Sequence, residues 1–165
     1  MSLGTKKVCH ISFVVKDIDK TVGNWADFLG ISIPRIWNIP KSQEAPALTN
    51  GKLEDYSDCR ISVIEMDNLV LEFVQPGENP SPWKTWLEDH GEGFQHIAFV
   101  VEDREKAKAM LKEKFGVEDW YHVGYYPGGA YAFYDTKDAL ATEVNIKDNH
   151  NNVAIIEELL KQLNK

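Results

Sequence analysis

The stretch QHIAFVVED at residues 95–103 has the pattern of a buried strand with a histidine near its start. The chain carries nearly the same stretch, CHISFVVKD, at residues 9–17. The offset of 86 residues holds without a gap between 10–31 and 96–117, where eight of 22 aligned positions are identical. A repeat of this length predicts a duplicated structural unit. It makes His10 and His96 equivalent positions.

The first copy opens a module of one strand, one helix and three further strands. In the strand, expected at 8–15, alternation places His10 on one face with Ser12 and Val14. Apolar residues at helical spacing follow and stop at Gly30, the expected helix end. The next strands are expected at 31–37, 59–66 and 69–74.

The second copy repeats this order. Its strand starts near Phe94, its helix ends at Gly116, and three strands are expected at 119–125, 130–135 and 140–146. Ser81-Pro82 predicts the start of a linking helix, and the last residues predict an amphipathic helix. We therefore predict an α+β fold in one domain, residues 1–165. Its parts are module one (7–76), a linker helix (80–91), module two (93–147) and a C-terminal helix (151–164).

A polar stretch at residues 38–57 interrupts module one. It contains Pro40, Pro46 and Gly51 and is long for a connection inside a compact domain. Two interpretations remain open for it, a mobile lid and a disordered segment.

Composition limits the classes of function. The chain has 165 residues, a formal net charge of −8 and a pI near 5.1. A nucleic-acid or anionic-membrane surface needs clustered Lys and Arg, so we expect neither partner. No apolar run approaches the roughly 20 residues of a membrane span, and no secretory signal is visible. The two cysteines form no framework, so we expect a cytoplasmic protein.

Two glutamates interrupt apolar strands at corresponding places. Glu72 lies in Leu71-Glu72-Phe73, and Glu143 lies in Thr142-Glu143-Val144. Burying an unpaired carboxylate costs several kcal/mol. A cation held by His10, Glu72, His96 and Glu143 would offset that cost, and these ligand types suit Zn, Ni, Co, Mn or Fe. The alternative is that each histidine is a hydrogen-bonded structural residue and each glutamate faces water.

The chain resembles the vicinal oxygen chelate superfamily, which includes glyoxalases, bleomycin-resistance proteins and dioxygenases, over roughly residues 7–147. The segment LEFVQP at 71–76, followed by Ser81-Pro82 and GFQHI at 93–97, is similar to methylmalonyl-CoA epimerase. The set of two histidines and two glutamates is similar to glyoxalase I (lactoylglutathione lyase). The resemblance implies two βαβββ modules that form an open, U-shaped mixed sheet around one metal. It also implies that His10, Glu72, His96 and Glu143 are the ligands.

The resemblance implies a metal-dependent lyase or isomerase that moves a proton next to a carbonyl. A divalent ion (Zn, Ni, Co or Mn, before Fe) would polarise the carbonyl, and a carboxylate would move the proton. We expect Glu143 to be that base, with Glu72 as the second choice. The expected substrate is a small carbonyl compound or thioester, and the expected assembly is a homodimer.

Several features of the sequence differ from what a methylmalonyl-CoA epimerase or a glyoxalase I requires. An epimerase needs proton donors on both faces of its intermediate. Of the inward candidates expected on 59–66 (Arg60, Ser62 and Ile64) none is a carboxylate, and Glu65 lies near the turn. For the carboxylates of glutathione, Arg35 and Arg60 are the available basic residues.

Two rival functions remain. The first is a ring-cleaving extradiol dioxygenase, for which His122 and Tyr131 would form an acid/base pair. The typical dioxygenase ligand set of two histidines and one glutamate leaves Glu72 unexplained. The second rival is a drug-sequestering protein of the bleomycin-resistance type, which carries no metal. The retention of four ligand positions argues against it.

Overall fold

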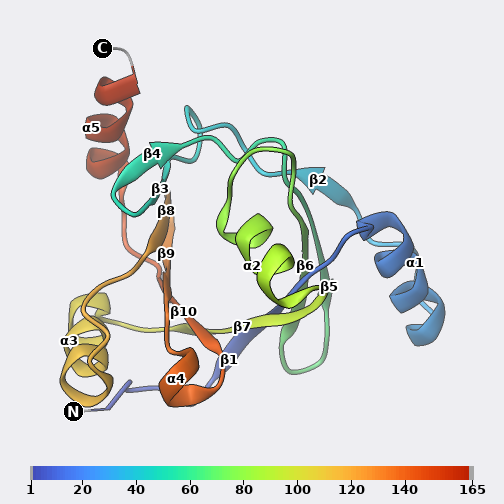
Figure 1. The fold of residues 1–165 in the computed structure, drawn as a ribbon, viewed down its shortest axis with the longest axis horizontal. Coiled ribbons are helices and arrows are strands. Elements are labelled where there is room, and N and C mark those ends of the chain that lie inside the picture. The colour runs from blue at the N-terminus through green and yellow to red at the C-terminus, as the bar shows by residue number, and fades with distance from the viewer. Residues whose placement is uncertain (1, 164–165) are drawn as a thin grey trace. The chain divides into compact units, whose positions relative to one another are not determined.

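The computed structural model describes residues 2–163 and forms two compact units (Figure 1). We call residues 10–39 and 56–95 the His10 unit. We call residues 2–9, 40–55 and 96–163 the His96 unit. The two units share the helix-on-sheet construction expected of the repeat.

The His10 unit holds four strands in the order β2-β5-β6-β1. β1 and β6 are parallel, whereas the β5 pairs are antiparallel. A buried cluster joins helix α1 to one face of these strands: Val15, Ile18, Val22, Ile64, Leu71 and Phe73. The bounds are β1 Val8–Val14, α1 Ile18–Leu29, β2 Ile36–Asn38, β5 Arg60–Glu65, β6 Val70–Gln75 and α2 Pro82–His90.

The His96 unit holds six strands in the order β7-β10-β9-β8-β3-β4. β7 and β10 are parallel, and the other pairs are antiparallel. Helix α3 packs on one face through Ala107, Met110 and Leu111. The bounds are β3 Ala47–Thr49, β4 Lys52–Glu54, β7 Gly93–Val100, α3 Arg104–Phe115, β8 His122–Tyr126, β9 Gly129–Tyr134, α4 Lys137–Leu140, β10 Glu143–Asp148 and α5 Val153–Leu163.

The sequence repeat is confirmed as a structural repeat. Its identical residues include the groups that begin and end the two helices. Asp17 caps α1 by accepting from the Lys20 N–H, and Asp103 caps α3 through the Lys106 N–H, both at 3.0 Å. Gly30 and Gly116 end these helices with φ values of 68° and 70°, a left-handed conformation that favours glycine. The repeated cap and stop residues therefore fix the start and the end of each helix at equivalent positions of the two modules.

The prediction of a mobile or disordered segment at 38–57 is wrong. Most of this segment belongs to the His96 unit, where β3 pairs with β8 and turns back as β4. Backbone bonds fix it further, because the Asn50 N–H donates to the Tyr121 carbonyl at 2.7 Å and the Tyr125 N–H to the Pro46 carbonyl at 3.0 Å. The segment supplies hydrogen-bond partners to the backbone N–H and C=O groups at the open edge of β8. The sequence did not predict its two strands, because three residues are too few to show an alternating pattern.

The predicted α+β class and the mixed parallel and antiparallel strand pairing are confirmed. Three strand boundaries differ from the predictions. The strand expected at 31–37 covers only Ile36–Asn38, and the strand expected at 119–125 begins at His122. The strand expected at 140–146 begins at Glu143, because the short helix α4 precedes β10. Among residues 2–163, none of the helices is both long and apolar enough to cross a bilayer. The single-domain boundaries stay a prediction.

Candidate metal centre

In the His10 unit, a histidine and a carboxylate lie close together on the sheet face opposite α1. Ile11 and Phe13 pack toward the α1 cluster, so alternation turns His10 and Ser12 to the other face, as predicted. His10 is 6% exposed, and its Nε2 lies 3.9 Å from Glu72 Oε1. The Ser12 hydroxyl donates to the same oxygen at 2.9 Å. This arrangement orients the Glu72 carboxylate toward the imidazole.

The expected inward residues of β5 lie on the wrong face. Ile64 belongs to the cluster around α1, and alternation places Ser62 and Arg60 on that side too. Arg60 forms a bidentate ion pair with Asp19 of α1, in which the two terminal guanidinium nitrogens lie 2.5 and 3.0 Å from the carboxylate oxygens. Val63, the direct neighbour of Glu72 on β5, lies on the same sheet face as Glu72 instead. Arg60 is therefore held away from that face and does not serve a glutathione carboxylate there.

In the His96 unit, the second histidine is fully buried among polar and aromatic side chains. Its ring lies 4.7 Å from the Phe133 ring, centroid to centroid. Parallel pairing sets Glu143 directly beside His96 and places Asn145 two residues further along β10. Asn145 Nδ2 lies 3.3 Å from His96 Nε2. Asn145 and Phe133 thus contact this imidazole, and Glu143 is its neighbour in the strand register.

Glu143 is only 4% exposed, and both of its oxygens already have partners. The Tyr121 hydroxyl donates to Oε2 at 2.6 Å, and Lys137 Nζ donates to Oε1 at 3.0 Å. Burial, followed by the negative charge of Glu143, raises the pKa of Tyr121 well above its usual value. Burial alone would lower the pKa of Lys137, but hydrogen bonds to Asp135 and Glu143 outweigh it and raise the value. The carboxylate is therefore held by one neutral and one cationic donor.

Strand register corrects the predicted equivalence of the two glutamates. In the His10 unit, His10 pairs with Val70, and Glu72 lies two residues beyond. In the His96 unit, His96 pairs with Glu143, and Asn145 lies two residues beyond. Asn145 is therefore the structural counterpart of Glu72, and Glu143 is the counterpart of Val70. The sequence pattern missed this because residues two apart share a face of a strand.

A second polar group lies on the same unit. The Thr49 hydroxyl is 2.8 Å from His122 Nδ1, and the Tyr131 hydroxyl is 3.3 Å from His122 Nε2. Complete burial lowers the pKa of His122 to about 3. The structure thus brings together the predicted pair of His122 and Tyr131 and adds Thr49 from β3. At neutral pH this imidazole is uncharged.

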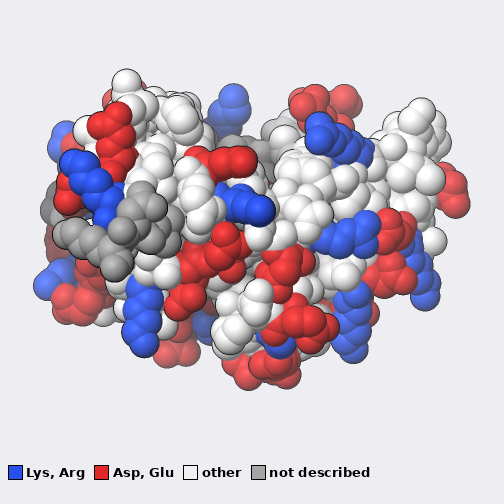
Figure 2. Space-filling model, turned by 90° about the horizontal axis from the view of Figure 1, so that it is seen from above, with Lys and Arg blue, Asp and Glu red and all other residues white. Residues whose placement is uncertain are grey.

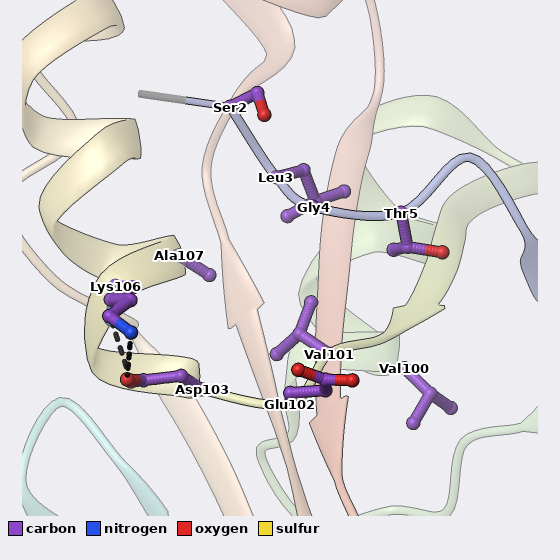
Figure 3. A pocket seen from close by; sticks show the side chains of 10 residues that line it. All are labelled: Ser2, Leu3, Gly4, Thr5, Val100, Val101, Glu102, Asp103, Lys106 and Ala107. Carbon is purple, nitrogen blue, oxygen red and sulfur yellow. Dashed lines mark hydrogen bonds and ion pairs between the residues drawn. The ribbon is translucent and has the colours of Figure 1, made fainter.

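One pocket of the His96 unit is lined by neither histidine. Residues 2–5 and the start of α3 line it, together with Val100, Val101, Glu102 and Asp103 (Figure 3). The charge of Asp103 is already paired with Lys106 at 3.4 Å. Figure 2 shows Lys and Arg side chains scattered among Asp and Glu on the face in view. Neither feature adds a ligand to the histidine clusters.

The donor chemistry around the two histidines fits a divalent ion. Imidazole nitrogen and carboxylate oxygen are ligands for Zn, Ni, Co, Mn and Fe. Asn145 adds a buried oxygen, Oδ1, that has no hydrogen-bond partner among residues 2–163. Native proteins rarely leave such an acceptor unsatisfied, so it fits a ligand position. The sequence analysis missed Asn145, Tyr121 and Lys137, because amide, phenol and lysine side chains in strands and turns are common.

Solved structures share the fold at low identity. A hypothetical protein from Bacillus halodurans is 21% identical, with a TM-score of 0.62 over 88% of this chain and 95% of the other. Methylmalonyl-CoA epimerase from Mycobacterium tuberculosis is 18% identical, with a TM-score of 0.60 over 94% and 95%. A Streptomyces coelicolor methylmalonyl-CoA epimerase variant in complex with 2-nitronate-propionyl-CoA is 19% identical, with a TM-score of 0.61 over 90% and 96%.

The search of curated proteins gives no match. The family model described as the Glyoxalase/Bleomycin resistance protein/Dioxygenase superfamily matches residues 9–134, which is more than half of the chain. The match spans both copies of the repeat and both histidines. The chain belongs to the glyoxalase/bleomycin resistance/dioxygenase superfamily.

Proposed function

We propose that this protein is a metal-dependent enzyme that moves a proton next to the carbonyl of a small thioester or related carbonyl compound. The observation that carries the proposal is the buried carboxylate of Glu143, held by Tyr121 and Lys137 directly beside His96. A carboxylate beside a candidate metal ligand is a candidate general base for a substrate bound to that metal.

In this proposal His10, Glu72 and His96 hold the ion. His10 and Glu72 are adjacent in one unit, and the internal repeat makes His96 the counterpart of His10. When bound, the ion would polarise the substrate carbonyl and stabilise the negative charge that develops on its oxygen. Ser12 supports the set by orienting Glu72.

Glu143 removes and returns the proton. Each carboxylate oxygen has two acceptor sites, so the bonds to Tyr121 and Lys137 leave one site on each oxygen. Lys137 pairs with the carboxylate through Oε1, and Tyr121 fixes the plane of the carboxylate through Oε2. Glu72 would serve as the second acid/base group only if it left the ion.

A thioester substrate is better supported than a glutathione adduct. The structures of similar epimerases include complexes with methylmalonyl-CoA and with 2-nitronate-propionyl-CoA. Arg60, one of the two basic residues considered for glutathione, is bound to Asp19 on the α1 side. We therefore place 2-methyl acyl-CoA thioesters ahead of hemithioacetals. The homodimer and the cytoplasmic location remain parts of this proposal.

The first experiment is elemental analysis of the untagged protein purified without chelators. We expect about one divalent transition metal per chain. His96→Ala should lose it with its circular dichroism spectrum unchanged, while His150→Ala, at a largely exposed histidine, should retain it. Solvent deuterium should then enter a 2-methyl acyl-CoA at the α-carbon, and Glu143→Gln should stop this exchange. A wild-type protein that stays metal-free after reconstitution would contradict the proposal.

The dioxygenase remains the second candidate because Thr49 and Tyr131 form a hydrogen-bonded group with the buried imidazole of His122. The same elemental analysis separates the two functions. Iron in the purified protein together with oxygen consumption on catechols would favour ring cleavage. Deuterium exchange without oxygen consumption would favour proton transfer.

A further inference from the structure

We propose that Lys147 binds an anionic group of the substrate that lies far from the reacting carbon, which in a CoA thioester is a phosphate of the nucleotide portion. The inference rests on the proposed function and deepens it, because it names the residue that recognises the distant end of the thioester. All of the residues that carry the inference belong to the His96 unit.

Lys147 lies on the same sheet face as the candidate base Glu143. Val144 and Ile146 of β10 belong to the buried cluster under helix α3, so alternation turns Glu143 and Lys147 to the opposite face. The two residues are four positions apart on one strand. A rise of about 3.3 Å per residue therefore separates their backbones by about 13 Å. The Lys147 side chain thus reaches a part of the substrate that is distant from the carbon beside Glu143.

The ammonium group of Lys147 differs from the other half-buried cations in having no partner. Five of the six half-buried lysine and arginine side chains in residues 2–163 form a hydrogen bond or an ion pair: Lys84, Lys108, Lys137, Arg60 and Arg104. The sixth, Lys147, forms neither with any residue in this range. Partial burial of an unpaired charge costs solvation free energy, which a bound anion would offset.

The neighbours of Lys147 leave its ammonium group uncovered. Val100 pairs with Lys147 on β7 and Tyr131 pairs with it on β9, and neither carries a carboxylate. The Tyr131 ring leans away from β10 toward β8, where a Cβ placed at Gly124 would overlap it. His122 holds the ring there, with its Nε2 3.3 Å from the Tyr131 hydroxyl. The aromatic side chain therefore does not occupy the space beside Lys147.

The distance along β10 favours a phosphate over a carboxylate of the acyl group. In the proposed reaction, a carboxylate borne by the α-carbon would lie beside Glu143, about 13 Å along the strand from Lys147. A CoA thioester carries its phosphates at the other end of the molecule. A lysine ammonium binds phosphate as a compact charge with three donors. Lys147 therefore matches the distant anionic end of such a thioester.

The test combines isothermal calorimetry with CoA and deuterium exchange into two substrates. Lys147→Met keeps the length of the side chain, removes its charge and should leave the circular dichroism spectrum unchanged. We expect it to weaken CoA binding and to raise KM for a 2-methyl acyl-CoA, each by about tenfold, with kcat within about twofold. The matching acyl pantetheine thioester, which has no phosphate, should keep its KM. Lys147→Arg should bind CoA within about threefold of the wild type. Lys114→Met, at an exposed lysine of α3 on the opposite face, is the matched control.

The outcomes separate the inference from the proposed function. If Lys147→Met binds CoA like the wild type, or if the pantetheine thioester suffers an equal loss, the inference is overturned, while exchange by the wild type would leave the proposed enzyme standing. A loss confined to thioesters with an acyl carboxylate, with CoA binding unchanged, would place Lys147 at the acyl group and also overturn the inference.

Binding and exchange by the wild type are read independently. If the wild type exchanges no thioester but binds CoA in a manner that depends on Lys147, the proposed reaction is wrong and the phosphate site is supported. If the wild type does not bind CoA, the inference is overturned even where a smaller carbonyl compound undergoes exchange.

Discussion

Replacing Tyr121 by phenylalanine removes one hydroxyl from the buried cluster around Glu143. That hydroxyl donates to Glu143 Oε2 at 2.6 Å, and the carboxylate is only 4% exposed. Water cannot readily replace a donor at such a position. Lys137 remains as the second donor, so the carboxylate stays paired but loses half of its hydrogen bonds.

The expected cost follows from the kind of bond that is lost. Hydrogen bonds to charged groups contribute about 1.5–3 kcal/mol to stability. A chain of 165 residues has an unfolding entropy of about 0.35 kcal/mol/K near 60 °C. We therefore expect Tyr121→Phe to lower the free energy of unfolding by about 1.5–3 kcal/mol. The corresponding fall in Tm is about 4–9 °C.

The assay is urea denaturation of chelator-treated protein for a double-mutant cycle of Tyr121→Phe and Glu143→Gln. Tyr126→Phe, whose hydroxyl has no partner in the described part of the chain, is the matched control and should change stability little. If Tyr121 acts through Glu143, the coupling energy should be at least about 1 kcal/mol. A coupling energy near zero, or an equal loss in Tyr126→Phe, would refute the assignment of this bond.

Three further predictions concern the helix cap, the packing of Tyr131 and the buried histidine. Asp17→Ala removes the bond to the Lys20 N–H and should cost about 1 kcal/mol in urea denaturation, whereas Asp17→Asn should keep most of it; equal losses would contradict the capping role. A Cβ at Gly124 would overlap the Tyr131 ring, so Gly124→Ala should cost about 1–3 kcal/mol and shift the Tyr131 ring resonances in NMR spectra. Unchanged resonances would show that the ring is not packed there. Burial lowers the pKa of His122 to about 3, below its unfolded value, so the unfolded chain binds the extra proton. Stability should fall as the pH drops from about 6.5 toward 3, by up to about 1.4 kcal/mol per pH unit. His122→Gln should remove this contribution, and an unchanged pH profile in the variant would exclude His122 as its source.

Much of the fold follows from local signals in the chain. The repeat places His10 at the position equivalent to His96. It also places the residues that begin and end helix α1 at positions equivalent to those of helix α3, which the structure confirms. Local signals succeed here because capping depends on a few neighbouring residues. Alternation also placed His10 and Ser12 on one face of β1 correctly, since successive side chains of a strand point to opposite sides.

Alternation could not choose between Glu143 and Asn145. Residues two apart share a face, so both side chains satisfy the same pattern, and the glutamate matched Glu72 by residue type. The choice depends on the pairing of β10 with β7, which sets Glu143 beside His96. That register is a non-local property, fixed by backbone hydrogen bonds between strands more than 40 residues apart in the sequence.

The same reason explains the segment at 40–55 and the surroundings of Glu143. β3 exists because the edge of β8 offers it unpaired N–H and C=O groups, and no signal inside three residues predicts that edge. Tyr121 and Lys137 meet at Glu143 from a loop and a short helix that the chain brings together only on folding. The residue types and faces of the candidate site follow from local chain geometry, whereas its partners and register follow from contacts between distant strands.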